Sequence, residues 1–302
     1  MKPHSQPNAE STWWAVVRLL RWDKPSGRLI LMIPALWAVV LAARGRPPIP
    51  LIGIIVLGSL ATSAAGCVIN DLWDRNIDPQ VKRTRHRPLA SRVLSIRTGL
   101  VVMIIALVSA AGLATYFNPL TFILCIIAIP FIGLYPLSKR VFPIPQLVLA
   151  ITWGFAILIS WSALSCGSHQ PTTPCLGVET WLLWGATVLW TLGFDTVYAM
   201  ADRRDDRRIG IHSSALLFGQ YAGHLVGFCF GLTTVFLSIL GLVMGLTTGF
   251  WVGIGIALSI WITHYMRLIR RRIPRHTYGD IFQQNVGVGF ILLFGMITGT
   301  VI

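Results

Sequence analysis

Runs of about twenty apolar residues recur along the whole chain, and this pattern limits the fold to a membrane-embedded one. The hydrocarbon core of a bilayer is about 30 Å thick, and an α-helix needs roughly 20 apolar residues to cross it. Turn residues such as Asn118-Pro119 separate neighbouring runs. We therefore predict an all-α polytopic membrane protein with about nine transmembrane helices. The predicted spans lie near residues 27–44, 49–69, 98–117, 119–137, 145–165, 181–201, 221–245, 249–266 and 281–301.

The composition agrees with this fold class. The chain of 302 residues is 54% hydrophobic and only 12% charged, whereas soluble domains are closer to about one-quarter charged. No polar linker or low-complexity tract divides the chain, which indicates a single membrane domain over residues 1–302. We interpret residues 1–22 as a cytoplasmic N-terminal segment. A cleavable signal is not expected, because residues 13–28 carry four basic side chains and no apolar core of signal-peptide length.

The basic residues are distributed unevenly between the two sides that nine spans define. Of the 25 Lys and Arg residues, 23 fall on one side, and only Arg44 and Arg46 fall on the other. Because short loops rich in Lys and Arg stay in the cytoplasm, we predict a cytoplasmic N-terminus and an outside C-terminus, in the inner (plasma) membrane or an internal membrane. The net charge of +14 then reflects topology, and no DNA-binding module indicates a nucleic acid partner. We interpret the basic stretch 266–275 as a topology determinant and an anchor for lipid headgroups.

Two of the five cysteines, Cys166 and Cys175, share the one sizeable loop predicted on the outer side. A structural disulfide between them is an open alternative to two free thiols, and it requires an oxidising compartment. No spacing typical of a metal site links the five cysteines.

A first group of acidic residues follows the second apolar run. Asn70, Asp74 and Asp78 are spaced four residues apart, which stacks their side chains on one face of a helix. Asp71 lies on the neighbouring edge, and Pro79 disfavours helix at Asp78. Carboxylates at the C-terminus of a helix oppose its dipole, so this arrangement favours a bound cation.

A second group lies at the end of the sixth run. Asp202 and Asp206 are four residues apart, and Asp195 is seven residues before Asp202, two turns up the same face. Tyr198 falls on that face too. A carboxylate within a membrane segment is costly, and Asp195 is therefore a functional-site hypothesis.

Two acidic groups that meet would repel each other unless a cation lies between them. Mg²⁺ takes oxygen ligands, usually one or two carboxylates together with phosphate oxygens and water. Basic residues that follow each group are suited to hold the outer phosphate oxygens. We therefore interpret the two groups as a site for a metal diphosphate. For several of the arginines, the alternative is that they lie in solvated loops and form only local ion pairs. The basic residues suited to phosphate are Lys82, Arg83, Arg87, Arg203 and Arg207.

Four segments resemble the motifs of UbiA-type intramembrane aromatic prenyltransferases. NDLWDRNIDPQVKRTRHRPLAS resembles the first aspartate-rich signature of that family, and DTVYAMADRRDDRRIGIHSSALLFG resembles the second. LYPLSKRVFPIPQLVLAITWGFA and WDKPSGRLILMIPALW are similar to two further segments of the family. The second signature is most similar to the 4-hydroxybenzoate branch. His212 is a departure, because close relatives often carry Lys there, and a cation that titrates replaces a fixed one.

The resemblance implies a helical bundle around a central cavity open to the cytoplasmic side. It implies Mg²⁺-dependent transfer of a polyprenyl group from polyprenyl diphosphate to the ring carbon ortho to the hydroxyl of 4-hydroxybenzoate, in ubiquinone or plastoquinone biosynthesis. Asp74 and Asp202 would be central to catalysis, and Asp195 or Tyr198 would polarise the phenol. Arg140 would bind the benzoate carboxylate. Diphosphate would bind to Arg28, Lys82, Arg83 and Lys139, and the metal to Asn70, Asp71, Asp74, Asp78, Asp202 and Asp206.

Other functions stay open at this point. The acceptor could be homogentisate, dihydroxynaphthoate or a tetrapyrrole. An ion-coupled transporter would need aspartates along a route through the bilayer, yet the predicted acids gather on one side. A membrane CDP-alcohol phosphotransferase would need a DGxxAR run, which neither acidic group contains.

Overall fold

The computed structural model describes residues 11–24, 26–166, 175–270 and 272–300. Within these ranges the chain forms helices and no strand, which confirms the predicted fold class. The helices are α1 (Thr12–Leu19), α2 (Ser26–Ala42), α3 (Ile49–Trp73), α4 (Ile96–Ala114), α5 (Pro119–Val141), α6 (Pro145–Ser165), α7 (Val178–Ile209), α8 (Ser214–Leu217), α9 (Ala222–Met244), α10 (Thr248–Leu268) and α11 (His276–Thr300), with 3-10 turns η1 (Asp78–Gln80) and η2 (Gly219–Tyr221).

Each predicted span corresponds to one of the long helices. Seven described helices are long and apolar enough to cross a membrane. α2 is a shorter apolar helix of 17 residues. α7 is the longest, with 32 residues, and its aspartates and arginines lower its apolar character. The protein is therefore an integral membrane protein in which the most polar of the long helices carries the second acidic group.

Turn residues set the helix ends where the sequence indicates them. The side chain of Asn118 accepts a hydrogen bond from the backbone N–H of Thr121 at 3.0 Å and thereby caps α5, while Pro119 occupies the first turn. α7 ends at Gly210 (φ +78°) and α9 ends at Gly245 (φ +66°). Both lie in the left-handed region, where glycine pays no steric penalty.

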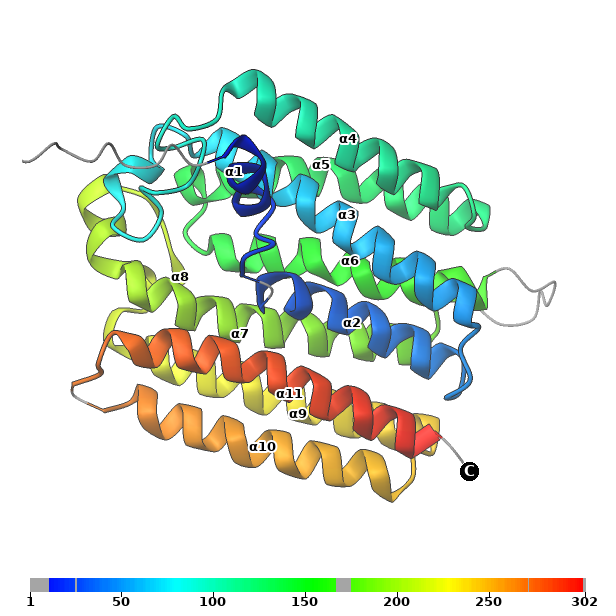
Figure 1. The fold of residues 1–302 in the computed structure, drawn as a ribbon. Helices are drawn as coiled ribbons and strands as arrows, with labels where there is room; N and C mark the ends of the chain where they lie inside the picture. Colours follow the sequence, from blue (N-terminus) through cyan, green and yellow to red (C-terminus); the bar gives the residue numbers. More distant parts are fainter. Residues whose placement is uncertain (1–10, 25, 167–174, 271, 301–302) are drawn as a thin grey trace, which may run out of the picture.

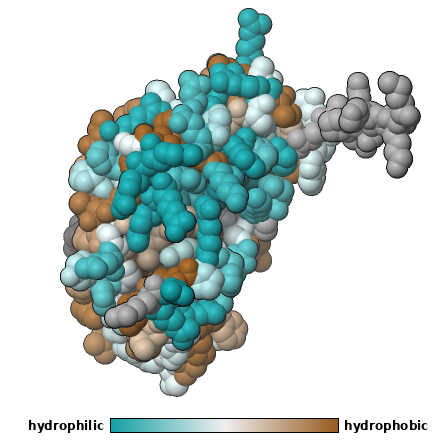
Figure 2. Space-filling view, turned by 90° about the vertical axis from the view of Figure 1, so that its left-hand side faces the viewer, coloured by the Kyte–Doolittle hydropathy of each residue, from teal (hydrophilic) through white to brown (hydrophobic). Residues whose placement is uncertain are grey.

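The long helices run nearly parallel to one another, and successive connections alternate between the two ends of the bundle (Figure 1). The connections α3–α4, α5–α6, α7–α8 and α10–α11 lie at the left-hand end in Figure 1, together with α1. Hydrophilic residues gather across this end of the molecule, which faces the viewer in Figure 2. The basic loops that the sequence predicts on one side therefore share one end of the bundle, which we call the charged end.

The core and the outer faces of the bundle differ in burial. A large buried cluster joins α2, α6, α7, α9, α10 and α11, and Trp37, Trp190 and Trp261 lie fully inside it. α4, by contrast, exposes Ile104, Ile105 and other large apolar side chains. Such a surface suits contact with lipid tails and would be unfavourable in water.

The loop at the opposite end contains the predicted disulfide. Cys166 and Cys175 are joined by an S–S bond, with their Cα atoms 5.0 Å apart, which confirms that alternative. The bond ties the end of α6 to the segment that precedes α7. The residues between the two cysteines lie outside the described part of the chain.

Candidate active site

The two acidic groups meet at the charged end around one cavity of about 250 Å³. Asn70, Asp74 and Asp78 line it from the end of α3 and the loop that follows. Acidic residues of α7 line it from the opposite side. α5 and α6 close it with further polar side chains. The residues that line the cavity include Asn70, Asp74, Asp78, Arg83, Thr84, Arg87, Tyr135, Ser138, Lys139, Gln146, Asp195, Tyr198, Asp202, Asp206, His212 and Ser213.

Asp74 is buried directly after the last residue of α3. Its backbone N–H bonds to the carbonyl oxygen of Asn70 at 3.0 Å, so the carboxylate lies at the negative end of the helix. Its side chain is only 2% exposed and forms an ion pair with Lys139 of α5. Burial raises the pKa of Asp74, and the charge of Lys139 opposes that rise. An unpaired Asp74 would therefore be costly at this position.

Asp78 lies in the 3-10 turn η1, beyond the end of α3, and not on a continuous helix face. Arg87 donates to its Oδ2 at 2.9 Å. Burial alone would lower the pKa of Arg87, but the charges of Asp71 and Asp78 more than offset this and raise it. Arg87 therefore stays charged and holds the loop against the end of α3.

Asp71 belongs to the same acidic group but does not line the cavity. Its carboxylate is fully buried and accepts from Arg21 at 2.6 Å and from Arg87 at 3.1 Å. Arg21 precedes α2 and has a left-handed backbone with φ +58°, which is unfavourable for a residue with a side chain. An Arg21–Asp71–Arg87–Asp78 chain of ion pairs thus connects the N-terminal segment to the cavity wall.

The acidic residues of α7 share one face, as their spacing predicts. Arg83 donates to Oδ2 of Asp202 from Nε at 2.8 Å and from Nη2 at 2.6 Å. Its Nη1 donates to the hydroxyl of Tyr198 at 2.8 Å, and the guanidinium lies 4.5 Å from the centre of that ring. Arg83 thereby connects the loop after α3 with α7 across the cavity.

Arg275 reaches the second acidic group from the loop between α10 and α11. Its Nη2 lies 3.6 Å from Oδ1 of Asp202 and 3.9 Å from Oδ2 of Asp205. The side chain of Arg275 is 54% exposed, and such exposed pairs contribute little stability. The sequence reading assigned this arginine only to topology and lipid headgroups. Proximity to Asp202 follows from the packing of α10 and α11 near α7 and has no local signal.

Comparison with known proteins identifies the family. The sequence matches the model of the UbiA prenyltransferase family over residues 31–282. The chain belongs to the UbiA prenyltransferase family. The match covers most of the chain and both acidic groups, so the transporter and the phosphotransferase are no longer needed as alternatives.

Relatives and solved structures agree with this membership. The UbiA-family chain is 58% identical to a 4-hydroxybenzoate solanesyltransferase of Synechocystis sp., over 97% of this chain and 98% of that one. It is 37% identical to a 4-hydroxybenzoate octaprenyltransferase of Actinobacillus pleuropneumoniae, over 95% and 96% of the two chains. In fold it resembles a UbiA homolog from Aeropyrum pernix K1, with a TM-score of 0.80, 22% identity and coverage of 91% and 98%. A UbiA homolog from Archaeoglobus fulgidus bound to GPP and Mg²⁺ has a TM-score of 0.69, 18% identity and coverage of 92% and 99%.

The donor atoms in the cavity of this UbiA-family chain fit a hard divalent cation. Oδ1 of Asp74 and Oδ1 of Asp202 are buried and have no hydrogen-bond partner among the described residues. An arginine lies 4.0 Å from Oδ1 of Asp74 and another lies 3.6 Å from Oδ1 of Asp202, so each oxygen has an ion-pair neighbour but no hydrogen bond. Each is therefore able to accept a further cation or donor. Within the described ranges, no three acidic, His or Cys side chains converge as a complete metal cage. Mg²⁺ commonly needs only one or two carboxylates when phosphate oxygens complete its shell, so the donor set fits an ion held together with a diphosphate.

Three predicted substrate-binding residues lie outside the cavity lining. Arg28, at the start of α2, lies 5.7 Å from the ring centre of Trp22. Lys82 is exposed to solvent, and Arg140 donates to the carbonyl oxygen of Trp73 at 2.6 Å. Their roles stay predictions. Arg83 and Lys139, in contrast, do line the cavity.

Several polar residues in the lining were not singled out from the sequence. Tyr135 lies four residues before Lys139 on α5, and this helical spacing could have indicated it. Gln146, near the start of α6, accepts from the backbone N–H of Ser214 at 2.7 Å and so holds the segment after α7. Ser138 lies three residues after Tyr135 on the same helix. Thr84 and Ser213 have no comparable signal, because their position depends on how the loops fold back over the helix ends.

Proposed function

We propose that this chain transfers a polyprenyl group from polyprenyl diphosphate to the ring carbon ortho to the hydroxyl of 4-hydroxybenzoate, in quinone biosynthesis. The observation that carries the proposal is the 58% identity to the Synechocystis 4-hydroxybenzoate solanesyltransferase along almost the whole of both chains. A cavity in which acidic and basic side chains alternate supports it, because that donor set suits a metal diphosphate.

Mg²⁺ would be held by Asn70, Asp74 and Asp78 on one side and by Asp202 and Asp206 on the other. When bound, it would supply positive charge that stabilises the departing diphosphate. In the family, a homolog from Archaeoglobus fulgidus has been seen with GPP and Mg²⁺. Oδ1 of Asp74 and Oδ1 of Asp202 are buried and accept no hydrogen bond from the described residues, which supports the same use here.

The basic residues of the cavity would bind the diphosphate. Arg83 and Lys139 each form an ion pair with an acidic residue of the cavity. With a cation held by those carboxylates, the two basic groups would be free to donate to phosphate oxygens. Their positions are already set by the surrounding loops, so little reorganisation is needed when the allylic C–O bond breaks.

The acceptor ring would lie deeper, near Asp195 and Tyr198. In the reaction the allylic carbon loses diphosphate and bonds to the ring carbon, and the displaced ring proton leaves to a base. Asp195 is the carboxylate in the lining that lies farthest up α7 from the charged end, and it is suited to polarise the phenol. A recessed site also keeps water away from the reactive allylic carbon.

We further propose that the charged end faces the cytoplasm, with the N-terminus inside and the C-terminus outside. The bias of 23 among 25 basic residues supports this orientation, since Lys-rich and Arg-rich loops stay in the cytoplasm. The Cys166–Cys175 disulfide at the other end supports it as well, because disulfides persist in oxidising compartments. To test this orientation, single cysteines are placed in the loops at either end of the bundle and labelled in intact cells. Labelling of a cysteine at the charged end from outside the cell would contradict the proposed orientation.

An acceptor assay tests the proposed reaction. Membranes that contain the protein are incubated with 4-hydroxybenzoate, solanesyl diphosphate and Mg²⁺, and the product is measured by mass spectrometry. We expect 3-polyprenyl-4-hydroxybenzoate. Homogentisate and dihydroxynaphthoate serve as comparison acceptors under the same conditions. Turnover of one of these, with none of 4-hydroxybenzoate by folded protein, would overturn the assignment.

A further inference from the structure

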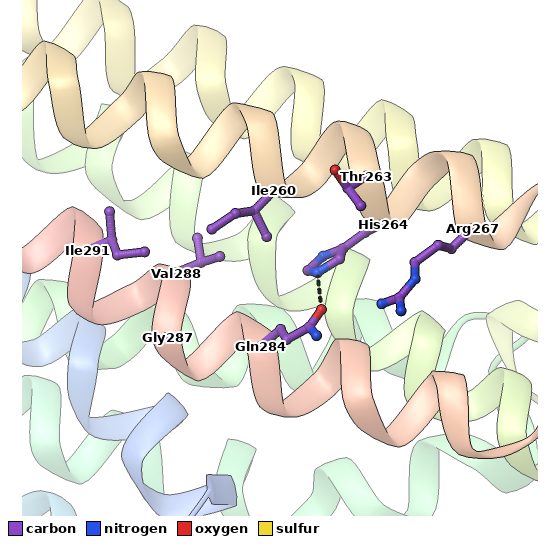
Figure 3. Close-up of a pocket in the computed structure, with 8 residues that line it drawn as sticks. All are labelled: Ile260, Thr263, His264, Arg267, Gln284, Gly287, Val288 and Ile291. Atoms are coloured by element: carbon purple, nitrogen blue, oxygen red, sulfur yellow. Dashed lines mark hydrogen bonds between the residues drawn. The ribbon is translucent and has the colours of Figure 1, made fainter.

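A second hollow lies between α10 and α11, on a part of the surface that the proposed reaction does not use. Its volume is about 510 Å³, within the range of about 300–1,000 Å³ that is typical of ligand pockets. It shares no lining residue with the cavity of the candidate active site. The lining residues, which Figure 3 shows, are Ile260, Thr263, His264, Arg267, Gln284, Gly287, Val288 and Ile291. We call this hollow the α10–α11 groove.

The α10–α11 groove is polar at one end and apolar at the other. Arg267 lies in the last turn of α10, at the charged end, and no carboxylate of the described residues lies within 4.0 Å of it. His264 and Gln284 come next, one turn deeper. Ile260 and Ile291 line the part farthest from Arg267 (Figure 3). A cationic end at the membrane surface and an apolar end within the membrane match the polarity of a phospholipid.

A buried histidine forms part of the wall of this groove. His264 is 0% exposed, and its Nε2 pairs with Oε1 of Gln284 at 2.8 Å. Its Nδ1 has no hydrogen-bond partner among the described residues. Because the side chain is closed off from the groove surface, His264 joins α10 to α11 through Gln284 and is not itself a contact of the ligand.

We propose that the α10–α11 groove binds an anionic phospholipid. Its phosphate lies against Arg267, and one acyl chain runs along Ile260 and Ile291. The neighbouring basic residues of the stretch 266–275 favour an anionic over a zwitterionic headgroup. This site is a defined, mostly apolar groove with one cationic end, in contrast to general attraction between basic loops and the membrane surface.

Filling the groove tests the place of the acyl chain. A Cβ at Gly287 would meet nothing within 4 Å, so Gly287→Leu introduces a side chain into open groove space. Gly255→Leu is the matched control, because Gly255 is also helical and open but lies outside the groove. Both changes replace a helical glycine by a good helix former. With dioleoyl phosphatidylglycerol and native mass spectrometry of the purified protein, we expect Gly287→Leu to weaken binding at least about tenfold and Gly255→Leu to leave it within about twofold.

Removing the cation tests the place of the phosphate. Arg267→Gln removes the groove arginine, and Arg270→Gln removes the same charge from an exposed position outside the lining. Loss of a charge-assisted hydrogen bond predicts about tenfold weaker binding for Arg267→Gln only. The proposal would be overturned in favour of surface attraction if both variants lost the same affinity for dioleoyl phosphatidylglycerol. It would also be overturned if the unchanged protein bound dioleoyl phosphatidylcholine as tightly as dioleoyl phosphatidylglycerol. Displacement of the lipid by solanesyl diphosphate would overturn it in favour of a substrate site. Should Gly287→Leu fail to fold, the arginine pair decides the question alone.

Discussion

The two acidic groups of the cavity are held in different ways. The first group spans the end of α3, and its cations come from three separate parts of the chain: the segment before α2, the loop after α3, and α5. The second group lies on the uninterrupted helix α7, and its closest cation is Arg83. Helical spacing alone therefore orients the second group, whereas the first group needs tertiary partners to hold acids that lie beyond a helix end.

The largest expected effect tests whether both groups are essential. Asp74→Ala and Asp202→Ala should each reduce turnover at least about 10²–10³-fold, because each removes a carboxylate that would hold the Mg²⁺ whose charge stabilises the departing diphosphate. Product formation from 4-hydroxybenzoate and solanesyl diphosphate is the measurement. Asp205→Ala is the control, since Asp205 does not line the cavity. Full activity in both variants would mean that the metal ligands are assigned wrongly.

Removal of the divalent cation should stop the reaction in the same way. We expect EDTA to abolish product formation and added Mg²⁺ to restore it, because the carboxylates cannot bind diphosphate without a cation between them. Asp78→Asn in the first acidic group and Asp206→Asn in the second sharpen the comparison between the two groups. Each variant should raise the Mg²⁺ concentration needed for the half-maximal rate. Turnover that persists in excess chelator would exclude the proposed metal.

Substitution of Arg83 should weaken diphosphate binding more than acceptor binding. Arg83→Ala removes two hydrogen bonds to Asp202 and one to Tyr198, and we expect about a tenfold or greater rise in the KM for solanesyl diphosphate. Lys82→Ala is a matched control, because Lys82 is the exposed neighbour outside the lining. A larger effect of Lys82→Ala would reverse the assignment.

Asp71 should matter for stability more than for chemistry. Asp71→Asn leaves Arg21 and Arg87 without their shared carboxylate, so we expect a lower melting temperature and a smaller loss of activity than for Asp74→Asn. A double-mutant cycle with Arg21→Gln should show coupling between the two residues. If Asp71→Asn instead raises the Mg²⁺ requirement as Asp78→Asn does, Asp71 is a metal ligand after all.

The smallest effect concerns Arg140. If it binds the benzoate carboxylate, Arg140→Ala should raise the KM for 4-hydroxybenzoate more than that for solanesyl diphosphate. Arg140 contacts the carbonyl of Trp73 and lies 4.0 Å from Asp74, so the expected change is a few-fold only. The opposite pattern of KM values would reassign Arg140 to the diphosphate side.

The sequence by itself determined the properties that depend on local order along the chain. The length of each apolar run predicts a membrane helix, and the spacing of Asp195, Tyr198 and Asp202 on α7 predicts one shared face. Loop charges predict a common charged end. The shared loop of Cys166 and Cys175 left a disulfide as one of two alternatives, and the structure decided between them. Each of these depends on distances of a few residues, which helix geometry translates directly into space.

Only the tertiary structure decided which way the acids at and beyond the end of α3 point. Asp71 and Asp74 are three residues apart, yet one is turned to Arg21 and the other to Lys139 and the cavity. Beyond Trp73 the chain leaves the regular helix, so the spacing of Asp78 no longer fixes the direction of its side chain. The approach of Arg275 to Asp202 and the α10–α11 groove have the same origin: they depend on which helices pack together, and no short segment of the chain encodes that.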